Sequence, residues 1–176
     1  MTDPFAVPAD PTEYTEWSEK DRFAIDLPAD EYLSRLSLWL PRVPEGEDIW
    51  ESDTRADRSL PEYLEELGKY TREQREDARR FWAQDERVTR SFLTYLAQFT
   101  EVADTYGPPS TIAEWWRNDP HADTDLPTYA RKMQAAKLRL ADVAEQAPRW
   151  SDSGKSISLI EYTKKHQKSN ARSRWF

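Results

Sequence analysis

Two short stretches carry residue types that could do chemistry, and the first resembles the end of a phosphate-binding loop. It reads Ser153-Gly154-Lys155-Ser156. The full pattern needs a Gly five residues before Gly154, where Arg149 stands. It also needs a strand in front, where the sequence instead predicts a helix that ends at Pro148. We therefore predict no nucleotide or cofactor site here.

The second stretch alternates Asp119, His121 and Asp123, a spacing that could bring an imidazole and two carboxylates toward a cation. The chain holds only two His and no Cys, so further ligands of the usual kinds are scarce. The stretch is therefore interpreted as a helix connection, and no metal site is predicted. No nucleophile elbow organises the Ser, His and Asp residues either, so we expect no catalytic residues and no enzymatic activity.

The charge of the chain is divided unevenly. Residues 1–126 hold 14 Lys plus Arg against 29 Asp plus Glu, a net −15, whereas residues 127–176 hold 11 against 4, a net +7. An acidic body repels nucleic acid, so we expect at most weak nucleic-acid binding through the basic end.

The composition also bears on the cellular setting. The absence of Cys is compatible with a reducing compartment. The first residues, MTDPFAVPADP, lack the apolar run and basic flank of a signal peptide, and no stretch approaches the about 18 apolar residues of a membrane span. We expect a protein that is cytoplasmic or within a virion, not secreted and without a membrane partner.

One segment has the strongest helical signal and is expected to organise the fold. Thr71 and Gln74 form a capping box, and Gly107 can close a helix in the left-handed conformation before Pro108. Apolar residues recur between them at spacings of three and four, with Asp85 as the one polar interruption. The pattern predicts a single long helix over about 72–106, with Phe92 and Phe99 buried.

Further helices are predicted on either side of this segment. A short helix is expected within 13–25, and the next opens at Asp26-Leu27-Pro28 and stops at Pro41. Residues 41–58 read as an acidic loop anchored by Ile49 and Trp50, followed by a helix over 60–67 that Gly68 separates from the long one. Later helices are expected from a second capping box at Thr111 and Glu114, and over 126–147.

Three of these helices open alike, with a capping residue, Leu, Pro and a Tyr soon after. The openings lie at residues 26–32, 59–63 and 125–129. Because the sequences diverge after each opening, shared cap chemistry is favoured over an internal duplication.

The C-terminal stretch is basic and ends in two aromatic residues. Residues 157–162 could be a short strand or one helical turn. We predict that the tail binds a protein partner, because large aromatics dominate binding energy and basic side chains favour acidic surfaces. The predicted partner-binding residues are Lys164, Lys165, Lys168, Arg172, Arg174, Trp175 and Phe176.

Together these patterns predict an all-α fold, an elongated bundle of five or six helices packed on the long central helix. The expected organisation is an extended N-terminal arm over 1–12, a helical domain over 13–148 and a basic C-terminal tail over 149–176. Prolines at three positions keep the arm extended.

The expected function is that of a non-catalytic structural or assembly protein. Its helical surfaces and terminal arms would bind other protein subunits in a homo- or hetero-oligomer. In composition, a small, acidic, Arg-rich helical chain beginning MTDPF, it resembles virion or assembly proteins of tailed bacteriophages, although no motif carries the likeness. The alternative is an acidic inhibitor that occupies a nucleic-acid-binding surface on a partner.

Overall fold

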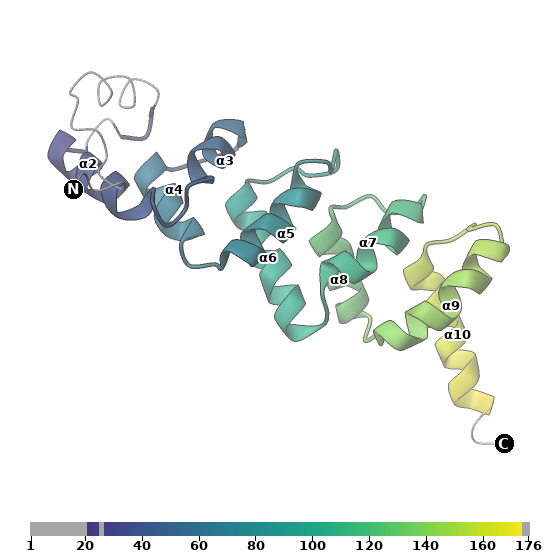
Figure 1. The fold of residues 1–176 in the computed structure, drawn as a ribbon. Coiled ribbons are helices and arrows are strands. Elements are labelled where there is room, and N and C mark those ends of the chain that lie inside the picture. Colours follow the sequence, from purple (N-terminus) through teal and green to yellow (C-terminus); the bar gives the residue numbers. More distant parts are fainter. Residues whose placement is uncertain (1–20, 25–26, 174–176) are drawn as a thin grey trace. The chain divides into compact units, whose positions relative to one another are not determined.

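The computed structural model describes residues 21–24 and 27–173, with side chains described as far as Gln167. All regular secondary structure in these residues is α-helical, which confirms the all-α class (Figure 1). The helices are α2 (Ala29–Trp39), α3 (Gly46–Ser52), α4 (Leu60–Leu67), α5 (Arg72–Trp82), α6 (Phe92–Thr105), α7 (Pro109–Asn118), α8 (Leu126–Ala135), α9 (Leu140–Asp152) and α10 (Leu159–Ser173).

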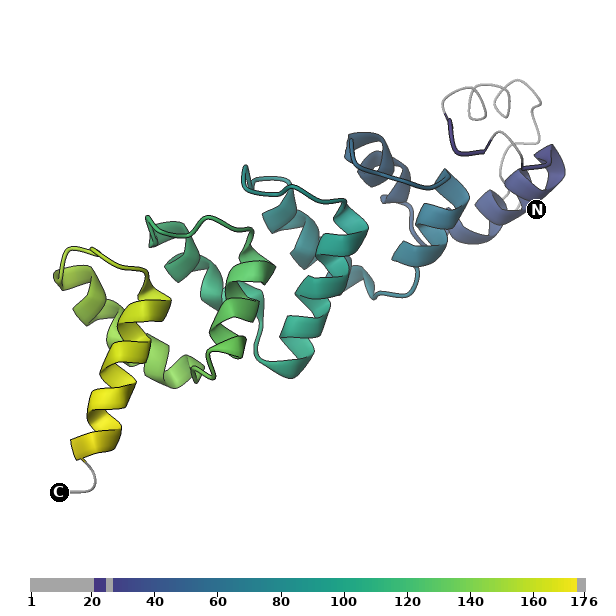
Figure 2. The ribbon, with the colours of Figure 1, turned by 180° about the vertical axis from the view of Figure 1, so that it is seen from behind.

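The chain forms two compact units. The first comprises Met1–Arg79 with Arg90–Leu96, and the second comprises Arg80–Thr89 with Ala97–Phe176. In the first unit α3 packs on α4, which also packs on α2; in the second, α7 packs on α8 and α9 on α10 (Figure 2). The consecutive pairs α3 and α4, α7 and α8, and α9 and α10 therefore form hairpins within one unit.

The hairpins share a plan. One helix carries a Trp near its C-terminal end, and the next carries a Tyr as its fourth residue. We call them Trp-helices and Tyr-helices. The Trp-helices are α3, α5, α7 and α9, with Trp50, Trp82, Trp116 and Trp150, and the Tyr-helices are α2, α4, α6, α8 and α10, with Tyr32, Tyr63, Tyr95, Tyr129 and Tyr162.

The predicted long helix over 72–106 is wrong, because residues 83–91 divide it into α5 and α6. Asp85, the polar interruption, turns the chain: its side chain accepts a hydrogen bond from the N–H of Arg87 at 2.9 Å, and its carbonyl from Val88 at 3.2 Å. A side chain that bonds nearby backbone competes with helix formation. Because this long helix does not form, the expected bundle of five or six helices packed on it is also wrong.

Other features of that segment agree with the sequence. The capping box forms, since Gln74 Oε1 accepts from the N–H of Thr71 at 2.9 Å and Thr71 Oγ1 accepts from the N–H of Gln74 at 3.2 Å. Phe92 and Phe99 are buried, as predicted. Gly68 ends α4 as predicted.

Gly107 does not take the left-handed conformation that was expected of it. A Cβ at Gly107 would lie 2.5 Å from Leu140 Cδ1, so this glycine permits close packing.

The predicted helix over 126–147 is also wrong. It breaks between α8 and α9 at Lys137, whose φ of 57° is left-handed. Leu138 N–H donates to Met133 O at 3.2 Å and Lys137 N–H to Gln134 O at 2.9 Å, the paired bonds of a Schellman ending. Pro148, the expected stop, lies inside α9.

Three smaller expectations also change. The acidic loop 41–58 contains α3, where Ile49 is fully buried as an anchor. The predicted box at Thr111 and Glu114 does not start a helix, because α7 begins at Pro109 without a side-chain cap. The predicted short helix over 13–25 lies almost wholly outside the described residues.

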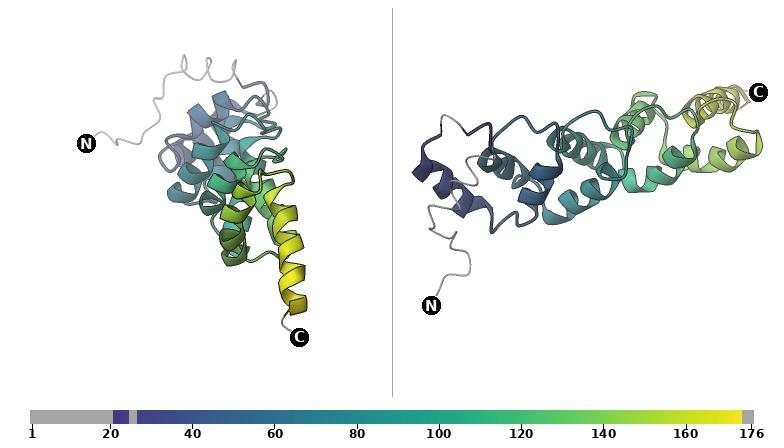
Figure 3. Two further views of the ribbon diagram at one scale, coloured as in Figure 1. Left: turned by 90° about the vertical axis from the view of Figure 1, so that its right-hand side faces the viewer. Right: turned by 90° about the horizontal axis from the view of Figure 1, so that it is seen from above.

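The basic stretch after Pro148 is helical over most of its length. Residues 159–173 form α10, which lies beside α9 (Figure 3). Leu159, Ile160 and Thr163 are buried against the rest of the second unit. The strand considered for residues 157–162 does not form, and the part of the expected tail up to Ser173 has its own packed helix.

Candidate functional site

A buried aspartate precedes each of four Tyr-helices. Asp21, Asp53, Asp85 and Asp119 are 0%, 4%, 8% and 3% exposed. They follow one another at intervals of 32, 32 and 34 residues. Isolated buried carboxylates are costly, so each needs hydrogen-bond donors from its surroundings.

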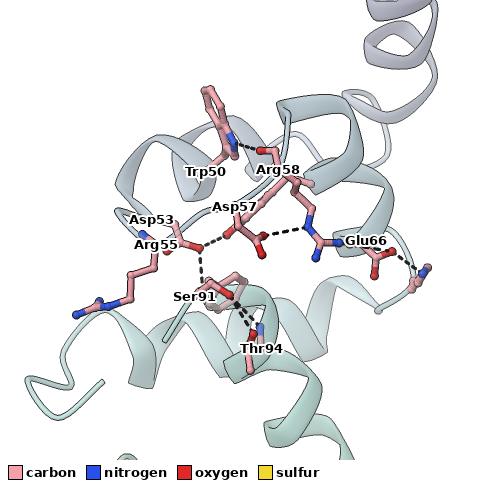
Figure 4. Close-up of polar contacts among 11 residues, drawn as sticks. Trp50, Asp53, Arg55, Asp57, Arg58, Glu66, Ser91 and Thr94 are labelled. Atoms are coloured by element: carbon pink, nitrogen blue, oxygen red, sulfur yellow. Dashed lines mark hydrogen bonds and ion pairs between the residues drawn. The ribbon is translucent and has the colours of Figure 1, made fainter. Parts of the chain in front are cut away.

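Asp53 shows how these donors are arranged (Figure 4). Its Oδ2 accepts from the Tyr63 hydroxyl at 2.8 Å and from the N–H of Phe92 at 2.9 Å, while Oδ1 accepts from the N–H of Arg55 at 3.1 Å. Tyr63 belongs to the same hairpin, and Phe92 is the first residue of the following Tyr-helix, α6. One carboxylate thus holds its own hairpin together and caps the next Tyr-helix.

The same arrangement, which we call the Asp clamp, recurs at other loops. Asp21 Oδ2 accepts from the Tyr32 hydroxyl and from the N–H of Leu60, both at 2.8 Å. In the second unit, Asp119 Oδ2 accepts from the Tyr129 hydroxyl at 2.7 Å and from the N–H of Leu159 at 3.0 Å. Asp85 follows this arrangement only in part: it interacts with the N–H of Leu126, the first residue of α8, but its Oδ2 is buried without a hydrogen-bond partner.

The clamps keep their tyrosines protonated. Burial, together with the charge and hydrogen bond of Asp53, raises the pKa of Tyr63 well above its usual value. Burial and the hydrogen bond to Asp119 do the same to the pKa of Tyr129. Burial also raises the pKa of Asp85. At Asp53 and Asp119 the shift of the Tyr pKa follows from packing and serves structure, because each carboxylate is surrounded by internal donors.

Three of the Trp side chains close the loop between a Trp-helix and the following Tyr-helix. Trp50 Nε1 donates to Arg58 O at 3.1 Å, and Trp116 Nε1 donates to Thr124 O at 2.9 Å. In the last hairpin Trp150 Nε1 donates to a backbone carbonyl in the corresponding place, at 2.8 Å. Each indole ties the start of its loop to the end.

The second residue after Asp85 and after Asp119 reaches toward the next loop. In the second unit, the Arg87 guanidinium donates to Ala122 O at 3.0 Å and lies 4.1 Å above the Trp116 ring. The His121 imidazole donates from Nε2 to Lys155 O at 2.8 Å, because a carbonyl oxygen can only accept. Phe23 occupies this position in the first loop and has no polar atom to offer.

The last hairpin of the second unit departs from the pattern. Asp152 and Ser153, which stand where a clamp aspartate would be, are both exposed. On α10, Thr163 and His166 take the places that apolar residues fill on α4, and His166 stacks on Tyr162 at 4.0 Å.

The chemical motifs considered from the sequence do not form sites. Asp119 is occupied by its clamp, His121 bonds Lys155, and Asp123 pairs with Lys132 at 3.3 Å, so the three do not converge on a cation. Lys155 Nζ donates to Asn118 O at 3.1 Å and follows a helix, unlike a phosphate-loop lysine. Within the described residues, no group of three or more His, Cys, Asp or Glu could hold a metal ion.

The predicted partner-binding residues fall into three groups. Lys164 and Lys165 are exposed on α10. Lys168 and Arg172 belong to the same helix, and their side chains are not described. The remaining three, Arg174, Trp175 and Phe176, lie outside the described residues. The structure therefore places the first two on a helix surface and leaves the function of the whole set as a prediction.

Lys164 lies with two other basic side chains around a pocket in the second unit. The pocket has a volume of about 580 Å³ and lies between α8, α10 and the loop before α10. Lys132 and His121 contribute to it, along with Ser156, Ser158 and Glu161. The sequence could not predict that these residues share a pocket, because only the packing of the hairpins brings them together.

The exposed positions of the Tyr-helices change charge along the chain. Two and three residues after the Tyr, the side chains are acidic on α4, uncharged on α6, and basic on α8 and α10. They are Glu65 and Glu66, Ala97 and Gln98, Arg131 and Lys132, and Lys164 and Lys165. On α2 the corresponding pair is Ser34 and Arg35. The inner residues repeat while these outer ones vary.

The acidic residues of α4 are partly used by neighbouring cations. Glu65 pairs with Arg35 of α2 at 2.9 Å, and Glu66 pairs with Lys69 at 2.6 Å. Such paired, partly exposed carboxylates do not form a continuous anionic stripe spaced like phosphates. The surface thus gives little support to the alternative of an inhibitor that mimics nucleic acid.

The repeat itself was not predicted from the sequence, although the sequence contains a signal for it. An apolar residue three positions before a Tyr recurs in the four later Tyr-helices, and an Asp lies ten positions before each of those tyrosines. The shared openings therefore belong to a repeated unit of structure that extends from the Trp to the Tyr-helix, and cap chemistry alone does not account for them.

Comparisons with known proteins add no relative. No protein-family model, no curated protein and no solved structure matches this chain. None of the helices in the described part of the chain is long and apolar enough to cross a membrane.

Proposed function

We propose that this chain is a non-catalytic assembly protein that binds other protein subunits, further copies of itself among them. The binding surfaces would be the outer faces of its Tyr-helices and its terminal arms. The observation that supports this most directly is the change of charge at equivalent positions of one repeated hairpin, from Glu65 and Glu66 on α4 to Lys164 and Lys165 on α10.

In repeat architectures, inner and outer residues have different roles. Inner positions repeat because each hairpin must pack on its neighbour, whereas outer positions are free to vary and to supply binding surface. In this chain the buried aspartates are occupied by internal hydrogen bonds, as at Asp53. What remains for function is the variable outer surface.

Opposite charges on the two units suit assembly in particular. An acidic face in one unit and a basic face in the other can each attract a partner of complementary charge, including another copy of the same chain. The compositional resemblance to virion and assembly proteins of tailed bacteriophages would place such contacts within a particle or its assembly pathway.

Sedimentation velocity across a concentration series tests the proposal. At low ionic strength we expect a mass above the 20.7 kDa of one chain, falling as salt is added. Lys165→Glu should weaken association, because Lys165 lies on the basic face of α10. Arg149→Glu is the matched control, since Arg149 is equally exposed but lies on a Trp-helix.

Three results would argue against the proposal. One is a mass of a single chain at every concentration, combined with no specific cross-link to a protein in host extract. Equal effects of Lys165→Glu and Arg149→Glu would show that net charge matters and the face does not. Tight binding of labelled single-stranded DNA at physiological salt would favour a nucleic-acid function instead.

A further inference from the structure

The first loop of the first unit has an exposed aromatic residue where two loops of the second unit have a polar link. Arg87 and His121 reach a carbonyl of the following loop, but Phe23 cannot. Its side chain is 40% exposed, and Leu38 is the other large apolar residue exposed in the described part of the chain. The Arg22 guanidinium lies 4.7 Å above the Phe23 ring.

Phe23 lines a pocket of about 470 Å³ in the first unit, which we call the Phe23 pocket. Trp50 and Ala56 supply the other apolar side chains of its wall. The indole N–H of Trp50 already bonds Arg58 O, as Figure 4 shows, so the ring adds apolar surface without an unsatisfied donor. The pocket therefore suits an aromatic side chain better than a polar ligand.

Among the described residues, Arg22 is the one basic residue that lines the Phe23 pocket, which lies beside an acidic stretch of the chain. Residues 45–58, which include α3 and the following loop, hold six Asp and Glu against two Arg. Glu51 lies on the rim and is exposed, whereas Asp53 is occupied by its clamp. An occupant that carries basic residues beside its aromatic would meet complementary charge there.

Two stretches near the ends of this chain carry aromatic side chains that lie outside the described residues. Residues 1–20 contain three, but they carry five acidic residues against one basic, so the rim would repel them. Residues 164–176 carry five basic residues, no acidic residue, and the pair Trp175 and Phe176. Charge therefore selects the second stretch.

We propose that the Phe23 pocket binds Trp175 or Phe176 of a second copy of this chain, with the basic residues of 164–174 against the acidic rim. This contact rests on the proposed assembly function, and it specifies a second copy of the chain as the partner and the Phe23 pocket as the acceptor site. Donor and acceptor are different surfaces, so the contact is heterologous and can continue from copy to copy.

A complementation experiment with two full-length variants tests this contact, one variant lacking the donor and the other lacking the acceptor. Trp175→Ala combined with Phe176→Ala removes the donor and keeps the acceptor, whereas Phe23→Ser removes the acceptor and keeps the donor. Each variant alone should lose association by about 30-fold or more, the loss expected for a buried aromatic hot spot. An equimolar mixture should form a complex that stops at one copy of each.

Two further variants keep the test independent of folding. Leu38→Ser is the matched control, because Leu38 is exposed and apolar but does not line the pocket, and it should associate like the wild type. If Phe23→Ser melts well below the wild type, Glu51→Lys replaces it, since this change touches only an exposed rim charge.

Disulfide trapping gives a second readout, because the chain has no Cys of its own. Mixing Phe23→Cys with Trp175→Cys under oxidising conditions should yield a linked pair of chains, and Leu38→Cys with Trp175→Cys should not.

The proposal fails if the wild type is a single chain at all concentrations, or if the variant mixture does not recover a complex. It fails equally if Trp17→Ala abolishes association while the changes at 175 and 176 do not, because the occupant is then the N-terminal stretch. Association that resists all pocket variants but responds to Lys165→Glu would leave the proposed function standing and remove only this acceptor site.

Discussion

Replacing Asp53 with Ala should cost far more stability than removing any exposed carboxylate of the same loop. The change leaves the Tyr63 hydroxyl and the N–H of Phe92 without their acceptor, and both residues are 0% exposed. Each buried donor left unsatisfied costs about 1–3 kcal/mol, so we expect Asp53→Ala to lower the free energy of unfolding by about 4 kcal/mol. The third donor, the N–H of Arg55, can turn to water.

A double-mutant cycle separates the clamp from a general loss of packing. Tyr63→Phe alone should cost about 1.5 kcal/mol, because the carboxylate keeps two donors. The double variant should cost about 1–2 kcal/mol less than the sum of the single ones, because no Tyr63 hydroxyl is left unsatisfied.

Urea unfolding followed by both circular dichroism and Trp fluorescence measures these free energies and checks that the two transitions coincide. Asp57→Ala is the control, because the Asp57 side chain is 72% exposed and pairs only with the adjacent Arg58. It should change stability by less than about 0.5 kcal/mol. A cost below about 1 kcal/mol for Asp53→Ala, or additive effects in the cycle, would refute the clamp.

Three further predictions follow from packing, backbone conformation and burial of charge. Phe99→Ala should cost about 3–5 kcal/mol in the same unfolding assay, since the ring is buried, and a cost under about 1 kcal/mol would mean the face is open in the isolated chain. Gly46→Ala should lower the melting temperature more than Gly154→Ala, and the reverse order would contradict this prediction. A Cβ at Gly46 would lie 2.1 Å from Cδ2 of the buried Leu64. A Cβ at Gly154 would meet open space, so this change costs only backbone strain of about 1 kcal/mol at φ 86°. Burial raises the pKa of Asp85 above 3.8, so the folded state binds this proton more readily than the unfolded state and loses stability as pH rises through the raised pKa. The free energy of unfolding of the wild type, relative to Asp85→Asn, should therefore increase as pH falls from neutral toward 4. A difference that does not change with pH would show that burial does not penalise this charge.

The sequence alone established the helical class and several helix boundaries, because those signals are local. The capping box at Thr71 and Gln74 is complete within four residues, and Gly68 acts on its own turn. The apolar periodicity that predicted burial of Phe92 and Phe99 is likewise a property of one segment. Such features need no knowledge of what the segment packs against.

The break between α5 and α6 was decided by tertiary structure. Periodicity runs on through residues 83–91, so the sequence favoured one helix. When the helix breaks, α6 can begin at Phe92, whose N–H then donates to the buried carboxylate of Asp53. Asp53 lies 39 residues earlier in the chain. No local window contains both ends of that bond.

The pockets follow from the same long-range packing. Lys164 meets Lys132 and His121, and Phe23 meets Trp50, only because successive hairpins bring their loops and Tyr-helices together. The sequence could identify Lys164 and Trp50 as exposed or anchoring residues from their types. Which residues share a cavity depends on clamps that join positions about 40 residues apart, and only the folded chain brings those positions within hydrogen-bond distance.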